Sequence, residues 1–174
     1  MASPSLPGLF EQKVVVGIAD LAVSNNHTLT LATYSLGSCI GVSIYDPVAK
    51  VGGLLHVMLP ESKIDLDKAQ RQPAMFMDTG IPALFRAAYE LKAEKYQVKI
   101  CVAGGAQVMD SSGFFSIGKR NYETLKAILN EHGLTIHAEQ VGGMVSRSMY
   151  LNLASGEVRL KVSGHAEDFV LCKN

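Results

Sequence analysis

The chain has few cysteines, and none of them are closely spaced. Its 174 residues include only three cysteines, Cys39, Cys101 and Cys172, which lie far apart in the sequence. An odd number of separated cysteines argues against a disulfide framework, and the lack of a CxxC pair argues against the common redox and zinc patterns. We therefore expect free thiols in a reducing compartment. A domain of this length needs neither a metal nor a disulfide to be stable.

An excess of one charge and a long hydrophobic run are also missing. Lysine plus arginine and aspartate plus glutamate both number 16, so the total charge favours neither nucleic acid nor an anionic membrane. No stretch reaches the roughly 18 consecutive apolar residues of a membrane helix. Residues 1–7 lack the basic and then apolar pattern of a secretion signal. We expect a cytoplasmic protein without nucleic-acid binding or membrane insertion.

The sequence shows no internal repeat, low-complexity run or interdomain linker. Its composition, 48% hydrophobic and 18% charged residues, is typical of a globular protein. We predict a flexible N-terminal lead at 1–12, a single domain at 13–165 and a C-terminal tail at 166–174.

Hydrophobic periodicity predicts a mixture of strands and helices. Strands are predicted at 14–16, 28–33, 39–45, 50–58, 98–102, 134–141, 147–153 and 157–163. Helices are predicted at about 75–96 and 121–129, the second ending at Gly133, and residues 60–74 are predicted to form a surface loop or a short helical excursion. About eight strands and two helices indicate an α+β fold, a mixed sheet system covered by helices.

The densest pattern of chemically useful residues surrounds Cys39. This cysteine follows Gly37 and Ser38, at the start of a predicted strand. A thiol at such a turn is accessible to substrate, and the turn amides can hold an oxyanion. Cys39, Gly37 and Ser38 are therefore candidate site residues.

His56 lies on the next predicted strand. If the two strands form a hairpin about Asp46 and Pro47, His56 returns close to Cys39. Cysteine and histidine form the minimal thiol nucleophile pair, in which the imidazole accepts the thiol proton. Thr33 can supply a hydroxyl that orients the imidazole ring.

A purely structural role is the alternative for these residue types. Free cysteines often pack as small hydrophobic residues, and a lone histidine on a strand is often a core residue. Cys101 has no polar neighbour in its strand, and Cys172 is close to the end of the sequence. No function is predicted for four other histidines, of which His165, near two acids, makes only a weak metal pattern. These four are His27, His132, His137 and His165.

Two partial motif matches do not hold. Residues 37–41 fit the spacing of a nucleophile elbow, but that motif requires a helix after the nucleophile, and residues 42–45 are typical of a strand. Residues 113–119 match most of a phosphate-binding loop. Arg120 stands where the hydroxyl ligand of magnesium belongs, so we predict no nucleotide site.

The pattern around Cys39 and His56 resembles the chemoreceptor glutamine deamidase family, CheD. The family pattern T-x-G-L-G-S-C-[IV]-x-V is matched here at 33–42 except at Ser35, and the pattern G-G-x-x-H-x-M-L-P is matched in full at 52–60. The resemblance runs from about 13 to 163. Further matches are at 104–106, 117–121 and 142–143 with Arg147, and the departures from the family pattern are Ser35, Met144 and Ser146.

This resemblance implies a cysteine-dependent hydrolase that converts glutamine side chains of chemoreceptor cytoplasmic helices to glutamate. It implies Cys39 as nucleophile, His56 as the proton-transfer group, Thr33 as its support, and turn amides near Ser38 for the oxyanion, with no cofactor and no metal. It also implies hydrolysis of receptor methyl esters, a CheC-type phosphatase as partner, and a layered α/β/β fold shared with some bacterial toxin deamidases.

Two other functions remain open at this stage. The protein can be mainly a regulatory binding partner of a CheC-type phosphatase, using the same surface without catalysis. It can also be a thiol hydrolase of a small amide or ester, which predicts a closed pocket instead of an open groove.

Overall fold

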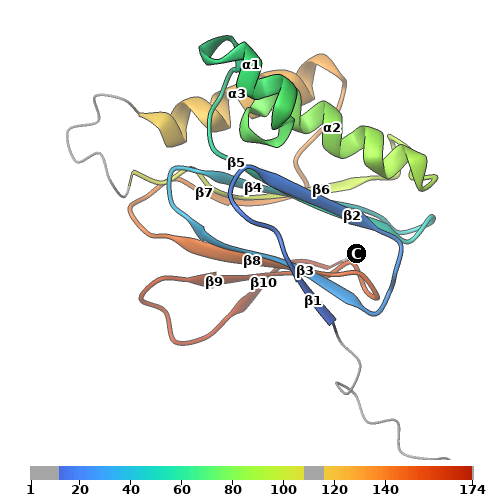
Figure 1. The fold of residues 1–174 in the computed structure, drawn as a ribbon. Helices are drawn as coiled ribbons and strands as arrows, with labels where there is room; N and C mark the ends of the chain where they lie inside the picture. Colours follow the sequence, from blue (N-terminus) through green and yellow to red (C-terminus); the bar gives the residue numbers. More distant parts are fainter. Residues whose placement is uncertain (1–11, 108–115, 174) are drawn as a thin grey trace, which may run out of the picture.

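The computed structural model describes residues 12–107 and 116–173. The predicted lead, up to residue 11, and the start of the phosphate-loop match, at 113–115, lie outside the described residues. The described chain forms three layers, with helices above two stacked five-stranded sheets (Figure 1). The predicted α+β class and its α/β/β layering are confirmed.

The middle layer is the sheet that carries Cys39 and His56. Its strand order is β2-β5-β4-β6-β7, with antiparallel pairs except for the parallel pair β6 and β7. The bounds are β2 Asp20–Ser24, β4 Ile40–Asp46, β5 Val51–Val57, β6 Lys99–Gly104 and β7 Ala138–Val141. The two central strands, β4 and β5, form the predicted hairpin.

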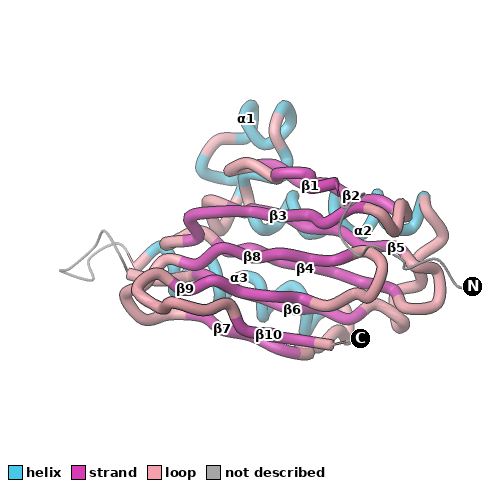
Figure 2. Tube along the Cα trace, turned by 90° about the horizontal axis from the view of Figure 1, so that it is seen from below, coloured by secondary structure: helices cyan, strands magenta, loops and turns pink. Residues whose placement is uncertain are grey.

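The outer layer is a second sheet of order β1-β3-β8-β9-β10, which lies in front of the first sheet when the molecule is seen from below (Figure 2). Its strands β1 and β3 are parallel and the other pairs are antiparallel. The bounds are β1 Gln12–Val15, β3 Leu29–Leu36, β8 Arg147–Asn152, β9 Val158–Val162 and β10 Phe169–Cys172. This sheet contributes Thr33 to the layer between the sheets.

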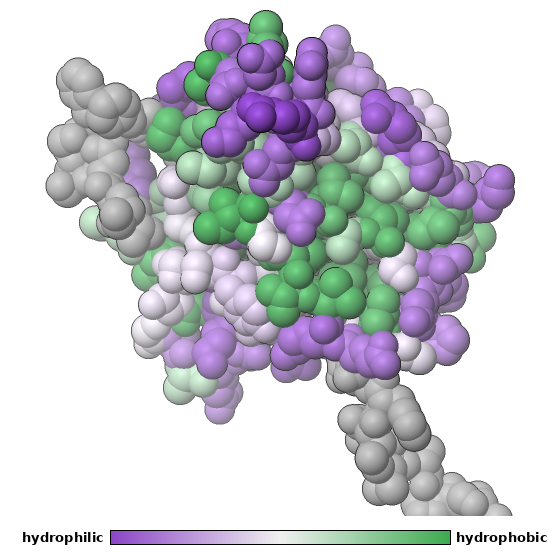
Figure 3. Space-filling view, in the orientation of Figure 1, coloured by the Kyte–Doolittle hydropathy of each residue, from purple (hydrophilic) through white to green (hydrophobic). Residues whose placement is uncertain are grey.

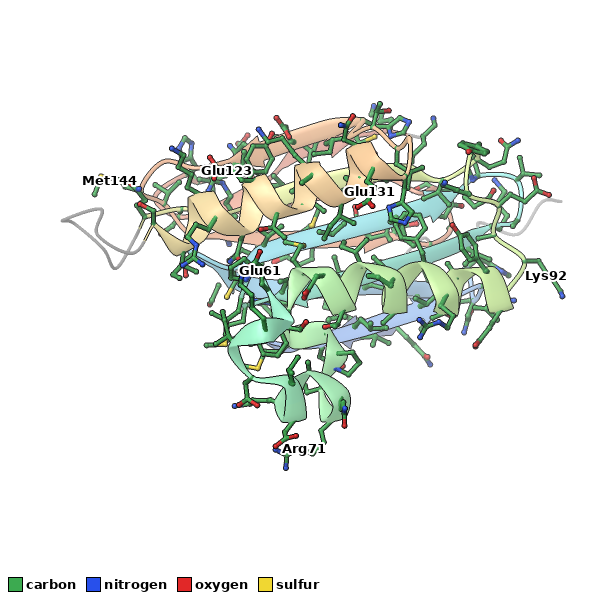
Figure 4. All side chains as sticks on the ribbon, turned by 90° about the horizontal axis from the view of Figure 1, so that it is seen from above. Glu61, Arg71, Lys92, Glu123, Glu131 and Met144 are labelled. Atoms are coloured by element: carbon green, nitrogen blue, oxygen red, sulfur yellow. The ribbon has the colours of Figure 1, made fainter. Side chains whose placement is uncertain are left out.

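Helices α2 and α3 lie side by side over the free face of the middle sheet (Figure 4). Apolar residues at helical spacing, such as Ile81, Leu84 and Ala88 of α2, face this sheet and are buried. The helical bounds are η1 Ser62–Ile64, α1 Leu66–Arg71, η2 Pro73–Met75, α2 Met77–Glu90 and α3 Ile117–Glu131. Met144 lies at the end of the molecule where α3 begins, and Lys92 lies at the opposite end (Figure 4).

Both faces of the β4–β5 hairpin are buried. Ile40 and Val42 of β4 pack under the helices, whereas Tyr45 of β4 and Leu54 of β5 pack between the sheets. Strands covered on both faces have nearly continuous apolar sequences, as these do. His56 shares its face with Leu54, so it belongs to the layer between the sheets.

One side of the molecule carries a hydrophobic patch bordered by polar residues (Figure 3).

Most predicted elements are present, and the differences are local. Gly133 has a φ of 68° directly after α3, as expected of a C-terminal cap. Strand β2 was not predicted, because an edge strand that begins with an aspartate gives a weak pattern. Segment 60–74 contains α1, and segment 166–174, expected as a tail, contains β10. Cys172, close to the end of the sequence, belongs to β10, which pairs with β9.

Candidate active site

The β4–β5 hairpin places Cys39 and His56 on the same face of the sheet. Gly41 stands opposite His56 in the antiparallel register, and Cys39 lies two residues before Gly41. Cys39 lies in the bend directly before β4, next to the end of β5 that carries His56. The Cys39 side chain is partly exposed and packs against the cluster between the sheets. The return of His56 toward Cys39, predicted from the hairpin, is confirmed.

Thr33 joins His56 to the other sheet. Its hydroxyl donates to the carbonyl oxygen of Val16 at 2.7 Å and lies 2.6 Å from Nδ1 of His56. A hydroxyl has one proton, and Val16 receives it, so His56 must donate from Nδ1–H to the threonine oxygen. The hydrogen-bond network therefore assigns the neutral tautomer whose free lone pair is on Nε2.

The imidazole of His56 is held neutral by its surroundings. The residue is 1% exposed, and burial lowers the pKa of His56 to about 4. Nε2 is buried, and within the described chain no group forms a hydrogen bond with it. At neutral pH His56 is thus an uncharged base with an unoccupied acceptor.

This lowered pKa makes a prediction about stability. Between pH 6.5 and 4 the unfolded chain binds a proton at His56 that the folded chain does not bind, so acidification favours unfolding. We expect His56 alone to remove up to about 3 kcal/mol from the free energy of unfolding as the pH falls through this window. Urea titrations from pH 7.5 to 4 measure the loss.

The matched variant is His56→Asn, whose amide can keep a donor near the position of Nδ1 but does not titrate. We expect its free energy of unfolding to fall less steeply over the same window, because His56 then contributes nothing to the pH dependence. Equal slopes in the two proteins would contradict a buried neutral His56.

Cys39 is a thiol, not a thiolate, in the resting site. Burial raises the pKa of Cys39, and the N–H group of the same residue offsets part of this effect. A raised thiol pKa beside a lowered imidazole pKa means that both groups are uncharged at neutral pH. The two groups are therefore not a preformed ion pair.

The loop before Cys39 has an unusual backbone. Ser35 has a φ of 58°, a left-handed conformation that costs a residue with a Cβ about 1–2 kcal/mol, which explains why glycine suits this position. The register of β3 against β8 shifts between Thr33 and Leu36, so the strand bulges here. In the described chain the backbone N–H groups of Ser38 and Cys39 bind no backbone carbonyl, and that of Cys39 interacts with the sulfur of its own side chain.

Asn121 and Arg147 are two buried polar residues to which the sequence analysis assigned no role. Asn121 of α3 donates to the carbonyl oxygens of Ser38 and Met58 at 3.0 and 3.1 Å. Arg147 of β8 is 5% exposed and donates to Gln140 and, at 3.4 Å, to the carbonyl oxygen of Gly104. Both fall within the segments that carry the family resemblance, which was the one available signal.

The other cysteines have structural surroundings. Desolvation by burial raises the pKa of Cys101, and the neighbouring thiol of Cys172 raises it further. Both thiols belong to the cluster between the sheets. Cys39 differs from both, because it directly precedes the end of β4 that lies opposite His56, and it is therefore the candidate nucleophile.

The four other histidines do not join the site. His132 contacts the carbonyl oxygen of Ile128 at 2.9 Å at the end of α3, and the ring of His137 accepts from the N–H of Ile100 at 3.1 Å. His27 and His165 are exposed. The described ranges contain no cluster of three or more metal-binding side chains.

A thiol next to a histidine whose ring is oriented by a hydroxyl is the kind of site that cysteine hydrolases use. Residues 58–162 match the family described as CheD chemotactic sensory transduction. The chain also shares 48% identity over 151 residues with a probable chemoreceptor glutamine deamidase CheD 1 of Syntrophus aciditrophicus, covering 87% of this chain and 94% of the relative. This chain belongs to the CheD family.

Further relatives agree with this assignment. A probable chemoreceptor glutamine deamidase CheD of Solibacter usitatus is 44% identical, covering 91% of this chain and 94% of its own. Its counterpart from Pyrococcus abyssi is 39% identical, with coverages of 86% and 91%. A solved Neisseria meningitidis protein is only 10% identical, with a TM-score of 0.40 over 74% of this chain and 62% of its own, too distant to bear on function. Within the described residues, no helix is both long and apolar enough to cross a membrane.

Proposed function

We propose that this protein is a protein-glutamine deamidase that converts glutamine side chains in the cytoplasmic helices of chemoreceptors to glutamate. The names of its relatives support this substrate, and one observation supports the chemistry. The chain of hydrogen bonds from His56 through Thr33 to Val16 leaves a bare Nε2 lone pair on the face that carries Cys39. This is the arrangement that a thiol nucleophile requires of its base.

In the first half of the reaction, His56 Nε2 takes the Cys39 proton as the sulfur attacks the carboxamide carbon. A carbon–sulfur bond forms, and the carbonyl oxygen becomes an oxyanion that accepts hydrogen bonds from the N–H groups of Ser38 and Cys39. His56 returns the proton to the nitrogen. The carbon–nitrogen bond breaks, ammonia leaves, and a thioester remains on Cys39.

In the second half, water attacks the thioester carbon and gives a proton to His56 Nε2. The carbon–sulfur bond breaks, glutamate leaves, and His56 returns the proton to the Cys39 sulfur. Throughout, Nδ1–H of His56 donates to Thr33, which prevents the ring from turning its bare nitrogen away from the sulfur. A methyl ester presents the same acyl carbon, so we extend the proposal to receptor methyl esters, with methanol as the leaving group.

Exposed apolar side chains near the site in sequence favour a protein substrate over a small amide. Ile18 and Met58 are 57% and 39% exposed, and each is within two residues of a member of the site in the sequence. Exposed apolar side chains of this size are common where one protein contacts another.

The test uses purified protein and the cytoplasmic fragment of a chemoreceptor from the same organism. We expect peptide mass spectrometry to find glutamine converted to glutamate at specific positions, with ammonia released in equal amount. A fragment left unmodified, with only small amides or esters hydrolysed, would contradict the proposal and favour the small-molecule hydrolase.

A further prediction concerns Thr33. We expect Thr33→Val, which removes the hydroxyl and keeps the shape, to lower kcat about 10- to 100-fold with little change in KM. The variant leaves Nδ1–H unpaired, so the ring can rotate or adopt the other tautomer. Steady-state kinetics measure the effect, and ¹⁵N spectra of His56 report the tautomer.

The control is Thr33→Ser, which keeps the hydroxyl and should recover most of the lost kcat. The hydroxyl is buried, so Thr33→Val also lowers the free energy of unfolding by about 1–3 kcal/mol, and activity must be measured below its unfolding transition. Wild-type kcat in Thr33→Val would remove Thr33 from the mechanism.

A further inference from the structure

Asn121 connects the nucleophile loop to the strand that carries His56. Its side chain is fully buried, and its single amide nitrogen donates to both Ser38 and Met58. Ser38 directly precedes Cys39, and Met58 follows His56 by two residues. One amide group therefore bridges the two chain segments on which the proposed reaction depends.

The bond to Ser38 also determines where the N–H of Cys39 points. The Ser38 carbonyl and the Cys39 N–H belong to the same peptide group, and the described chain contains no cis peptide bond. In a trans peptide the two groups point in opposite directions, so Asn121 binds one side and aims the N–H away from itself. A hydrogen bond at the oxygen also polarises the peptide group and strengthens its N–H as a donor.

Helix α3 packs tightly against the backbone near Cys39, so Asn121 can hold the Ser38–Cys39 peptide in place. A Cβ on Gly118, one turn before Asn121, would lie 2.5 Å from the carbonyl carbon and oxygen of Gly105, so the helix rests directly on that backbone. Gly105 in turn donates to the carbonyl oxygen of Cys39 at 2.8 Å, and Ala106 donates to that of Gly37 at 2.8 Å. The loop around Cys39 is thus held by backbone contacts on both sides of the Asn121 bond.

The choice of asparagine carries a structural cost. Its Oδ1 atom is buried, and nothing in the described chain donates to it. Buried polar atoms without partners destabilise a fold, so the position is poorly explained by stability alone. What the amide offers is two N–H donors on one nitrogen, which a hydroxyl or an apolar side chain cannot supply.

We propose that Asn121 is a positioning residue, which holds the Ser38–Cys39 peptide so that its N–H faces the oxyanion and Cys39 stays beside His56. This inference rests on the proposed deamidase function. It also assigns a role to the 104–106 and 117–121 segments, which carry the family resemblance but contain no candidate reacting group.

The experiment compares Asn121→Leu, which keeps the approximate shape and removes both donors, with Leu125→Ala, a fully buried α3 residue one turn further on. We expect Asn121→Leu to lower kcat for receptor-fragment deamidation about 10- to 100-fold, with KM within about twofold of wild type. Leu125→Ala should keep most of kcat at a temperature where both variants are folded. A kcat no lower in Asn121→Leu than in Leu125→Ala, or a change confined to KM, overturns the proposal.

A second measurement does not depend on activity. In ¹H–¹⁵N spectra, loss of the bond to the Ser38 oxygen should shift the Cys39 amide proton upfield, and Leu125→Ala should leave it in place. Asn121→Ala replaces Asn121→Leu if the latter does not fold. An unchanged chemical shift of the Cys39 amide proton would reject the role of Asn121. Absence of deamidation by the wild-type protein would reject the proposed function, so the two failures are distinguishable.

Discussion

Replacing Cys39 by alanine is expected to lower the rate of receptor deamidation by at least about a thousandfold. Alanine removes the only atom of the site that can form the thioester, so no covalent route is left. The side chain is partly exposed at the edge of the cluster between the sheets, and its loss should leave the fold intact. Glutamate formation in a receptor fragment, followed by mass spectrometry, measures the loss.

Cys172→Ala is the matched control, because it removes another partly exposed thiol and should retain full activity. Cys39→Ser should be nearly as inactive as Cys39→Ala, since a hydroxyl is far harder to deprotonate than a thiol. The regulatory alternative gives the opposite result. If the protein acts mainly by binding a CheC-type phosphatase, a strain with Cys39→Ala keeps normal chemotaxis, and that outcome would reject the enzymatic function as the biological one.

The second large effect is expected for His56→Asn, which should lower kcat/KM about a hundred- to ten-thousandfold at neutral pH. Burial raises the pKa of Cys39, so without a base very little of the thiol ionises in neutral solution. His132→Asn changes an exposed histidine at the end of α3 and serves as the control. Activity in His56→Asn equal to that of this control would remove His56 from the mechanism.

The pH dependence of the same variant distinguishes a base from a structural residue. In the wild type, kcat/KM should stay level on acidification below pH 6.5, because the pKa of His56 is about 4 in the folded protein. In His56→Asn the remaining activity should rise with pH, since hydroxide then ionises Cys39 in place of the imidazole. A histidine that acts only in packing predicts parallel profiles in the two proteins.

The strongly patterned parts of the fold could be predicted from the sequence. The hairpin that joins Cys39 to His56 follows from two apolar runs around Asp46 and Pro47, because adjacent antiparallel strands need only a short turn. The two long helices follow from their apolar spacing. The edge strands β2 and β10 were missed, because strands of five and four residues are too short to give a clear pattern.

The candidate site was only partly visible at that level. Cys39 and His56 come from one hairpin, so local pattern and a turn suffice to bring them together. Thr33 was expected to orient the ring, and the structure supplies the contact as a bond between the two sheets. The carbonyl of Val16 could not have been found, because a backbone acceptor has no sequence signal.

By itself, the sequence determined the fold class, the hairpin and the types of reacting group, since each depends on periodicity, turn residues or side-chain chemistry. The tertiary structure alone decided the tautomer of His56, the lowered pKa of its ring and the contacts of Asn121 with both strands. These properties depend on burial and on hydrogen bonds between segments far apart in the chain. Such contacts form only when the two sheets and α3 pack together, and no local pattern of residues encodes them.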